Sequence, residues 1–210
     1  MNPDHAARLR NTLVFGRGEC GKTSFAIRYI INQPFVCVFV FDLLGQWAQR
    51  LHQRWSGTAE ECNAALATGH VIFNPFRMFK ASETDVAFQW FCDFAWQASQ
   101  GGPGRKILVA DDAGMFAAGR ILSPELANVI KLGRFYHLEF MGITHRPIQY
   151  HPDVRSQVTE WVAFATIPSD VECIEEYWAG VAGAVTLNQF EFLAYNRDSR
   201  AELRAKLPPP

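Results

Sequence analysis

The residues from Gly16 to Thr23 read Gly-Arg-Gly-Glu-Cys-Gly-Lys-Thr and match the pattern GxxxxGK[ST]. Glycines let such a loop wrap closely around an anion, so that backbone N–H groups and the following helix N-terminus point at its oxygens. Lys22 would place a positive charge at the β- and γ-phosphates, and the Thr23 hydroxyl would hold Mg²⁺. The pattern predicts an ATP-binding loop made of Gly16, Arg17, Gly18, Glu19, Cys20, Gly21, Lys22, Thr23 and Ser24.

A chance match to this pattern is expected roughly once in a hundred chains of this length, so a fortuitous glycine-rich turn is the weaker interpretation. Cys20 has two interpretations. A helix N-terminus lowers the pKa of a thiol, which would suit a redox switch. However, Cys20 occupies a variable position of the pattern, and we favour a tolerated residue without a redox role.

A second acidic motif follows the apolar stretch that begins at Lys106 and ends in Asp111 and Asp112. We predict that Asp111 holds Mg²⁺ through water and that Asp112 orients or deprotonates the attacking water. Hydrolysing P-loop proteins usually use glutamate for the second role, and aspartate is one methylene shorter. Glu19 is a weaker candidate for the base, and the alternative for the pair is a solvated turn at the end of a strand.

Short apolar runs alternate with longer amphipathic stretches, a pattern typical of a mostly parallel sheet covered by helices on both faces. The predicted class is therefore α/β, in one domain spanning 1–210 with a core of about 10–196 and a tail at 197–210. The predicted strands are 12–15, 36–41, 70–73, 106–110, 139–143, 161–166 and 190–195. The predicted helices are 22–31, 46–53, 59–67, 83–99, 124–132 and 171–178.

Composition limits the other possibilities. Of 210 residues 49% are hydrophobic and 20% are charged, which favours a folded globular domain over disorder. The net charge of −1 means that a polyanion would have to be met by a local basic patch. The five scattered cysteines suit a reducing compartment. The longest apolar run, 35–41, is too short to cross a bilayer, so we expect a cytoplasmic protein without a membrane span.

Several further segments make the chain resemble the FtsK/HerA division of P-loop ATPases over nearly its whole length. They are the acidic turn 41–46, the pair Gly133-Arg134, the strand and Arg-Pro sequence 140–147, and the strand and turn 162–170. The resemblance implies a RecA-like (ASCE) P-loop NTPase that acts as a DNA motor in a homo-oligomeric ring, with a hexamer favoured. It also implies an arginine acting on the neighbouring subunit's ATP, best matched by Arg134 and next by Arg146. Thr144 and His145 occupy the place of a γ-phosphate sensor, although His145 could equally be a hydrogen-bonded loop residue.

A bare motor core of this size resembles the genome-packaging ATPases of icosahedral viruses with an internal membrane. That resemblance implies double-stranded DNA and capsid or portal-vertex proteins as partners, in the host cytoplasm or at the packaging vertex of the virion. Candidate phosphate contacts are Arg77, Lys80, Arg105, Lys106 and Arg120, although each is also an ordinary surface cation. The charged residues of 197–206 fit a solvated helix, a subunit clasp or a nucleic-acid patch.

Two other functions stay open. An assembly, secretion or conjugation ATPase would share the same core but would be expected to carry a membrane anchor or docking domain. A small P-loop kinase would be expected to carry an arginine-rich lid over its acceptor, and the paired carboxylates argue against it. The aromatic residues of 83–99 could form a base-stacking platform, but their helical spacing favours core packing, with Trp90 and Trp96 off the main stripe.

Overall fold

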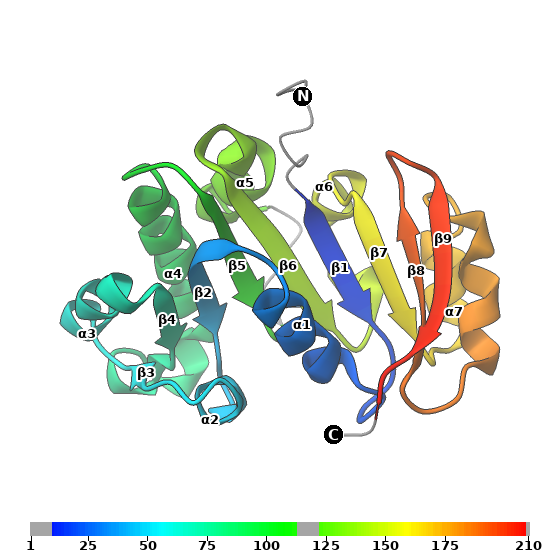
Figure 1. Ribbon diagram of the computed structural model, residues 1–210, viewed down its shortest axis with the longest axis horizontal. Coiled ribbons are helices and arrows are strands. Elements are labelled where there is room, and N and C mark those ends of the chain that lie inside the picture. Colours follow the sequence, from blue (N-terminus) through cyan, green and yellow to red (C-terminus); the bar gives the residue numbers. More distant parts are fainter. Residues whose placement is uncertain (1–9, 113–121, 209–210) are drawn as a thin grey trace.

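A computed structural model describes residues 10–112 and 122–208 (Figure 1). In this part of the chain one sheet has the strand order β3-β4-β2-β5-β6-β1-β7-β8-β9. The strands β1 to β7 pair in parallel, while β8 pairs antiparallel with β7 and with β9. The bounds are β1 Asn11–Phe15, β2 Phe35–Phe41, β3 Trp55–Ser56, β4 His70–Phe73, β5 Arg105–Ala110, β6 Leu138–Thr144, β7 Glu160–Phe164, β8 Glu191–Asn196 and β9 Ala201–Lys206.

The helices cover both faces of this sheet. Because side chains alternate along a strand, Leu13 and Phe15 of β1 enter one apolar cluster while Val14 enters the other. The cluster containing Val14 lies under α1 and α2, and the cluster containing Leu13 lies under α4 and the helices after it. The helix bounds are α1 Lys22–Ile31, α2 Gln46–Arg50, α3 Ala59–Ala65, α4 Thr84–Ser99, α5 Pro124–Ala127, α6 Pro152–Ser156 and α7 Pro168–Ile174. The predicted α/β fold is confirmed.

The aromatic residues of α4 belong to the core. Phe88, Phe91 and Cys92 are buried on the face that meets the sheet. Trp90 and Trp96 are partly buried against the same cluster, with the Trp90 ring 5.0 Å from that of Phe73 between ring centroids. These contacts support core packing over a base-stacking platform and show that the buried face is wider than the predicted stripe.

The C-terminal segment differs most from the sequence prediction. Residues 201–206 form the strand β9 at the edge of the sheet, so the solvated helix, one of the three interpretations of this segment, is wrong. The subunit clasp and the nucleic-acid patch stay predictions. Leu203 and the alanines on either side of it alternate with charged residues, which is the period of a strand and not of a helix. The sheet therefore extends beyond residue 196, and the buried side chain of Leu207 follows it.

Other differences concern short elements and boundaries. The helix predicted over 171–178 is α7, which begins at Pro168, because proline suits the first turn of a helix, and ends at Ile174. The helix predicted over 124–132 continues beyond α5 as a π-helical segment, Asn128–Leu132. The sequence prediction missed β3, α6 and the 3₁₀ helix Ala179–Thr186. None of the helices in the two described ranges is both long and apolar enough to span a bilayer.

Gly142 in the central strand β6 provides a test of the packing. A Cβ atom at Gly142 would lie 2.2 Å from the Tyr150 hydroxyl oxygen and 2.9 Å from Leu13 Cδ2. Because both neighbours are buried and cannot withdraw, Gly142→Ala should lower the free energy of unfolding by about 1–3 kcal/mol in urea denaturation. Gly101→Ala is the control, because no atom lies closer than 3.5 Å to the added Cβ. Equal stability of the two variants would contradict this packing.

Candidate nucleotide-binding site

The glycine-rich loop connects β1 to α1. Gly16 has φ 143° and Gly21 has φ 109°, values that side chains strongly disfavour. A Cβ atom at Gly16 would also lie 2.7 Å from the Cβ of Phe164. No side chain caps the N-terminus of α1, so its first backbone N–H groups are available to an anion. The loop thus has the geometry of a phosphate cradle.

Lys22, the first residue of α1, lies over this loop. It is 7% exposed, and its Nζ donates hydrogen bonds to the carbonyl oxygens of Gly16 (2.9 Å) and Arg17 (2.7 Å). Burial lowers the pKa of Lys22, and the nearby carboxylates Asp112 and Asp111 oppose that effect. The ammonium group is therefore already positioned at the mouth of the loop.

The two carboxylates lie beside the loop because β5 and β1 are parallel and flank β6, which brings their carboxyl ends to one edge of the sheet. Thr23 Oγ1 donates to Asp111 Oδ2 at 3.2 Å, and Trp47 Nε1 donates to the same oxygen at 2.8 Å. Burial raises the pKa of Asp111, the two donors lower it, and the adjacent Asp112 adds to the increase. The hydroxyl and carboxylate oxygens suit Mg²⁺, which takes few protein ligands and keeps its remaining positions for water and phosphate.

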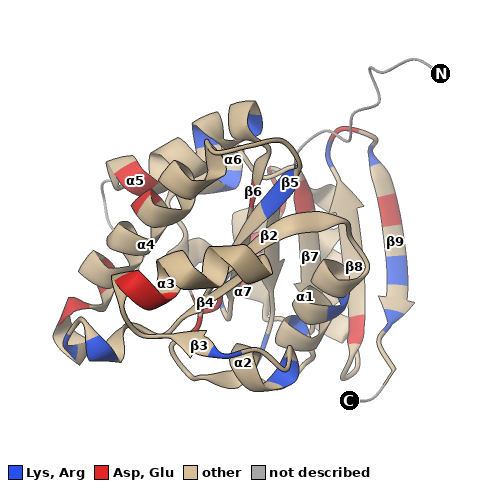
Figure 2. Cartoon of the chain, turned by 60° about the vertical axis from the view of Figure 1, so that its left-hand side comes forward, with Lys and Arg blue, Asp and Glu red and all other residues tan. Residues whose placement is uncertain are grey.

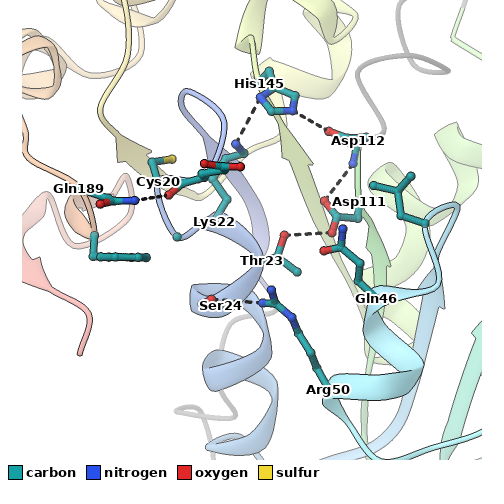
Figure 3. A pocket seen from close by; sticks show the side chains of 14 residues that line it. Cys20, Lys22, Thr23, Ser24, Gln46, Arg50, Asp111, Asp112, His145 and Gln189 are labelled. Atoms are coloured by element: carbon teal, nitrogen blue, oxygen red, sulfur yellow. Dashed lines mark hydrogen bonds and ion pairs between the residues drawn. The ribbon is translucent and has the colours of Figure 1, made fainter. Parts of the chain in front are cut away.

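His145 connects the second carboxylate to the lysine. Its Nε2 lies 3.4 Å from Asp112 Oδ1, and its Nδ1 lies 3.5 Å from Lys22 Nζ. Asp112 has φ 55°, and its backbone N–H donates to Asp111 Oδ1 at 3.1 Å. Figure 3 shows these side chains facing one another across the cavity. Of the two predicted sensor residues, Thr144 and His145, only His145 lies in the cavity lining.

The cavity has a volume of about 450 Å³, large enough for a nucleotide. From Glu19 to Ser24 the predicted loop residues line it continuously, together with Asp111 and Asp112. Sequence reasoning missed the other contributors among the described residues: Leu44, Gln46, Arg50, Gln189 and Phe190. Leu44 and Gln46 lie in the acidic turn 41–46, which was noted only for its resemblance. Arg50, Gln189 and Phe190 come from segments that no local pattern indicated.

Sequence reasoning also missed Trp47 as a residue of the site, although the acidic turn 41–46 that precedes it was a signal in the sequence. The buried Asp42 accepts hydrogen bonds from the backbone N–H groups of Gln46 (3.2 Å) and Trp47 (2.9 Å) and thereby starts α2. This cap places the Trp47 indole against Asp111. The acidic turn 41–46, noted for its resemblance, is therefore the element that positions a donor to Asp111, the carboxylate predicted to hold Mg²⁺.

The structure does not bring three predicted catalytic residues to the cavity lining. Thr144 is buried; its hydroxyl donates to Gln149 Oε1 at 3.0 Å and accepts from the Arg146 N–H, which closes the turn after β6. The guanidinium of Arg146 pairs with Asp170 Oδ1 at 3.0 Å, away from the lining. Arg134 precedes the opposite end of β6, so about 20 Å of strand separates it from the cavity. Any action of Arg134 on a nucleotide requires a second copy of the chain.

Cys20 is 4% exposed, and its thiol donates to the Arg17 carbonyl oxygen at 2.9 Å. Burial raises the pKa of Cys20, with an opposing effect from Lys22. A buried thiol of raised pKa is a poor redox nucleophile. These observations favour the tolerated residue over the redox switch.

Three of the basic residues considered for DNA contacts have structural partners. Lys106 Nζ donates to three backbone carbonyl oxygens, and Arg105 pairs with the buried Glu139 at 2.8 Å. Arg77 pairs with Glu61 at 2.7 Å and lies over the ring of Trp55. Arg120 lies outside the described residues. In the ribbon of Figure 2 both basic and acidic positions occur along the helices and β9.

The pair of Arg105 and Glu139 should make stability depend on pH. Burial raises the pKa of Glu139 to about 7, despite the opposing effect of Arg105. Among the described residues, Oε2 of Glu139 has no hydrogen-bond partner. Because this folded-state pKa exceeds the unfolded value, the protonated form stabilises the fold; that stabilisation is complete below about pH 4.5 and is lost as the pH rises through about 7.

When the pH is lowered from 8 to 5.5, the free energy of unfolding of the wild-type protein should therefore rise by about 2 kcal/mol more than that of Glu139→Gln. Urea denaturation of both proteins at both pH values measures this difference. Glu60→Gln, at a fully exposed position, is the control and should follow the wild type. Parallel profiles for wild type and Glu139→Gln would show that Glu139 is ionised throughout.

No protein-family model matches the chain, and no curated protein matches it in sequence. Several solved structures, however, are similar to the chain in fold. The genome packaging NTPase B204 from Sulfolobus turreted icosahedral virus 2 in complex with sulfate aligns with a TM-score of 0.78 and 17% identity, over 100% of this chain and 99% of that one. The chain has the P-loop NTPase fold.

Two other P-loop ATPases have the same architecture. VirB4 of Thermoanaerobacter pseudethanolicus aligns with a TM-score of 0.67 and 13% identity, over 95% of this chain and 89% of that one. EccC of Thermomonospora curvata (ATPases 2 and 3) aligns with a TM-score of 0.57 and 14% identity, over 96% of this chain and 37% of that one. At these identities the likeness is one of fold, and it confirms the fold class predicted from the sequence.

Proposed function

We propose that the protein hydrolyses ATP to ADP and phosphate. The observation that carries this proposal is the arrangement of Lys22, His145 and Asp112 around one end of a cavity whose floor is the glycine-rich loop. A cation that meets the γ-phosphate and a carboxylate able to take a proton from water are the groups that phosphoryl transfer to water needs. B204 has been solved in complex with ATP-gammaS, which supports a nucleotide in the equivalent place.

In the proposed reaction the loop N–H groups and Lys22 hold the triphosphate and stabilise the charge that develops on the γ-phosphoryl oxygens. Asp112 accepts a proton from the attacking water as the water oxygen bonds to the γ-phosphorus and the bond to the β,γ-bridging oxygen breaks. Thr23 and Asp111 would hold Mg²⁺, which when bound neutralises charge on the β- and γ-phosphates. His145 orients Asp112 relative to Lys22.

We further propose that hydrolysis drives double-stranded DNA into a capsid, through a homo-oligomeric ring in which a hexamer is favoured. The support is the likeness in fold to the DNA-packaging ATPase B204 from Sulfolobus turreted icosahedral virus, which aligns over 100% of both chains. Capsid or portal-vertex proteins would be the further partners, in the host cytoplasm or at the packaging vertex. We also propose that residues 1–210 form a single domain.

The surface around Arg134 supports a subunit contact. Arg134 is exposed, its guanidinium lies 4.9 Å from the ring centroid of Phe135, and Phe135 is itself 64% exposed. An exposed aromatic ring with a stacked arginine is a combination enriched at protein interfaces. In a ring, this surface would supply Arg134 to the γ-phosphate of the neighbouring subunit.

The test of the motor proposal is ATP turnover with and without duplex DNA across a range of protein concentrations. Turnover per chain should rise with concentration, as rings assemble, and should rise further with DNA. Turnover that responds to neither would leave an ATPase without the motor function. Stimulation by a small phosphate acceptor would indicate a kinase.

Arg134→Ala subunits should bind ATP but lose at least about 10³-fold in turnover, the range known for arginines supplied in trans. Mixing them with Asp112→Ala subunits should restore activity, because mixed rings contain sites with an intact arginine and an intact carboxylate. Arg200→Ala, at another exposed arginine, is the control and should behave as wild type. Absence of rescue would remove the trans-acting role.

An assembly or secretion ATPase is the second candidate function, and the likeness to VirB4 and EccC favours it. It predicts turnover that is independent of DNA and stimulated by a protein substrate. The same assay therefore separates the two candidates.

A further inference from the structure

The turn before β8 contains an aromatic residue in an unusual conformation. Phe190 has φ 66°, in the left-handed region that a bulky side chain rarely adopts. Such strain persists only where surrounding contacts impose it, and it is concentrated at ligand sites. Phe190 also lines the cavity of the proposed nucleotide site.

The contacts that impose this conformation join the turn to the phosphate loop. The backbone N–H of Phe190 donates to the Cys20 carbonyl oxygen at 3.2 Å, and Gln189 Nε2 donates to the Glu19 carbonyl oxygen at 3.2 Å. The backbone N–H of Leu207, just beyond β9, donates to the Phe190 carbonyl oxygen at 2.8 Å. The Phe190 ring reaches the loop itself, since its Cδ1 would lie 2.9 Å from a Cβ at Gly21.

The turn lies at the end of the cavity opposite the hydrolytic groups. Figure 3 shows Asp112 and His145 on one side of the loop and Gln189 on the other, with Lys22 and Thr23 between them. A triphosphate whose γ-phosphate meets Asp112 and Lys22 and whose chain follows the start of α1 would direct the rest of the nucleotide toward Gln189. Gln189 is exposed and Phe190 is half-buried, so both present surface to a ligand.

We propose that Gln189 and Phe190 form the base-recognition subsite of the nucleotide site and that they select adenine. The proposal rests on the proposed ATP hydrolysis. Every nucleobase presents a π-face on which an aromatic ring stacks, which is the role of Phe190. The amide of Gln189 reads the edge of the base, because glutamine matches the donor and acceptor pair of adenine.

Selection against guanine follows from the hydrogen bond that Gln189 already makes. One amide N–H is held by the Glu19 carbonyl oxygen, which leaves Oε1 and the second N–H for the ligand. Oε1 accepts from the exocyclic amino group of adenine, whereas guanine presents a carbonyl oxygen there. Turning the amide over to suit guanine would direct Oε1 at the Glu19 carbonyl oxygen and lose that bond.

The test measures binding by calorimetry of three probes: the β,γ-methylene analogues of ATP and GTP, and inorganic tripolyphosphate, which has no base. Phe190→Leu should weaken the ATP analogue at least about fivefold and leave tripolyphosphate within about twofold. Phe190→Tyr keeps the ring and should bind like wild type. Gln189→Ala, at an exposed position, should bring the affinities for the ATP and GTP analogues to within about twofold of each other.

Three results would overturn the inference. Equal weakening of tripolyphosphate and of the ATP analogue in Phe190→Leu would show that the ring supports the phosphate loop and not the base. Unchanged affinities in both Phe190→Leu and Gln189→Ala would place the base elsewhere, while the phosphate site and the proposed hydrolysis would stand. Wild-type protein that binds none of the three probes would refute the proposed function, and this inference with it.

Discussion

Lys22→Ala is expected to reduce kcat for ATP hydrolysis by at least about 10²-fold while the protein remains folded. A fixed cation at the site of developing charge is typically worth roughly 10²–10³-fold, because it requires no reorganisation during the reaction. The fold should survive, because the two carbonyl oxygens that Lys22 Nζ contacts belong to a loop that borders the cavity, outside the apolar core. Phosphate release and thermal unfolding measure the two effects.

Lys22→Arg is the matched control for charge. It keeps the positive charge but replaces a compact ammonium by a planar guanidinium, which does not fit among the loop carbonyl oxygens. We therefore expect it to remain well below wild type in turnover. Full activity in Lys22→Ala would show that the loop does not bind the transferred phosphate, and the proposed mechanism would fail.

Asp112→Asn is expected to keep ATP binding and to lose about 10²–10⁴-fold in turnover, the range typical of a general base. The amide has nearly the same shape as the carboxylate but cannot accept a proton from water. Asp111→Asn should instead weaken the dependence of nucleotide binding on Mg²⁺, since its oxygen faces the Thr23 hydroxyl. Single-turnover hydrolysis and binding measured with and without Mg²⁺ separate the two roles.

Asp93→Asn, on α4 and away from the cavity lining, is the control and should leave both measurements unchanged. Substantial turnover in Asp112→Asn would assign the base elsewhere. Glu19, which also lines the cavity, would then be the next carboxylate to replace.

The glycine-rich loop between β1 and α1 could be predicted from sequence because it is encoded locally. A strand, a glycine-rich turn and a helix that begins at Lys22 are encoded by adjacent residues, and the structure has α1 at the predicted bounds, Lys22–Ile31. The strand before Asp111 was equally recognisable from its apolar run. Parallel pairing then brings the two motifs to one sheet edge, as the class of fold requires.

The C-terminal strand shows where local reasoning failed. The charges of 197–206 allowed a solvated helix as one interpretation, although the alternation over 201–206 has the period of a strand. A run of 6 residues is too short for its period alone to exclude a helix. Pairing with β8 decides between them, and that pairing depends on residues outside the segment. A short charged stretch therefore did not determine its own secondary structure.

By itself the sequence determined the α/β class and located the glycine-rich loop and the carboxylate pair, since each depends on residues that are neighbours along the chain. Only the tertiary structure decided that His145 lies in the cavity while Thr144 and Arg146 close a turn, and that Trp47 meets Asp111. The reason is geometric. A residue at the end of a strand can face the cavity or the neighbouring turn, and only packing against residues from other elements selects one direction.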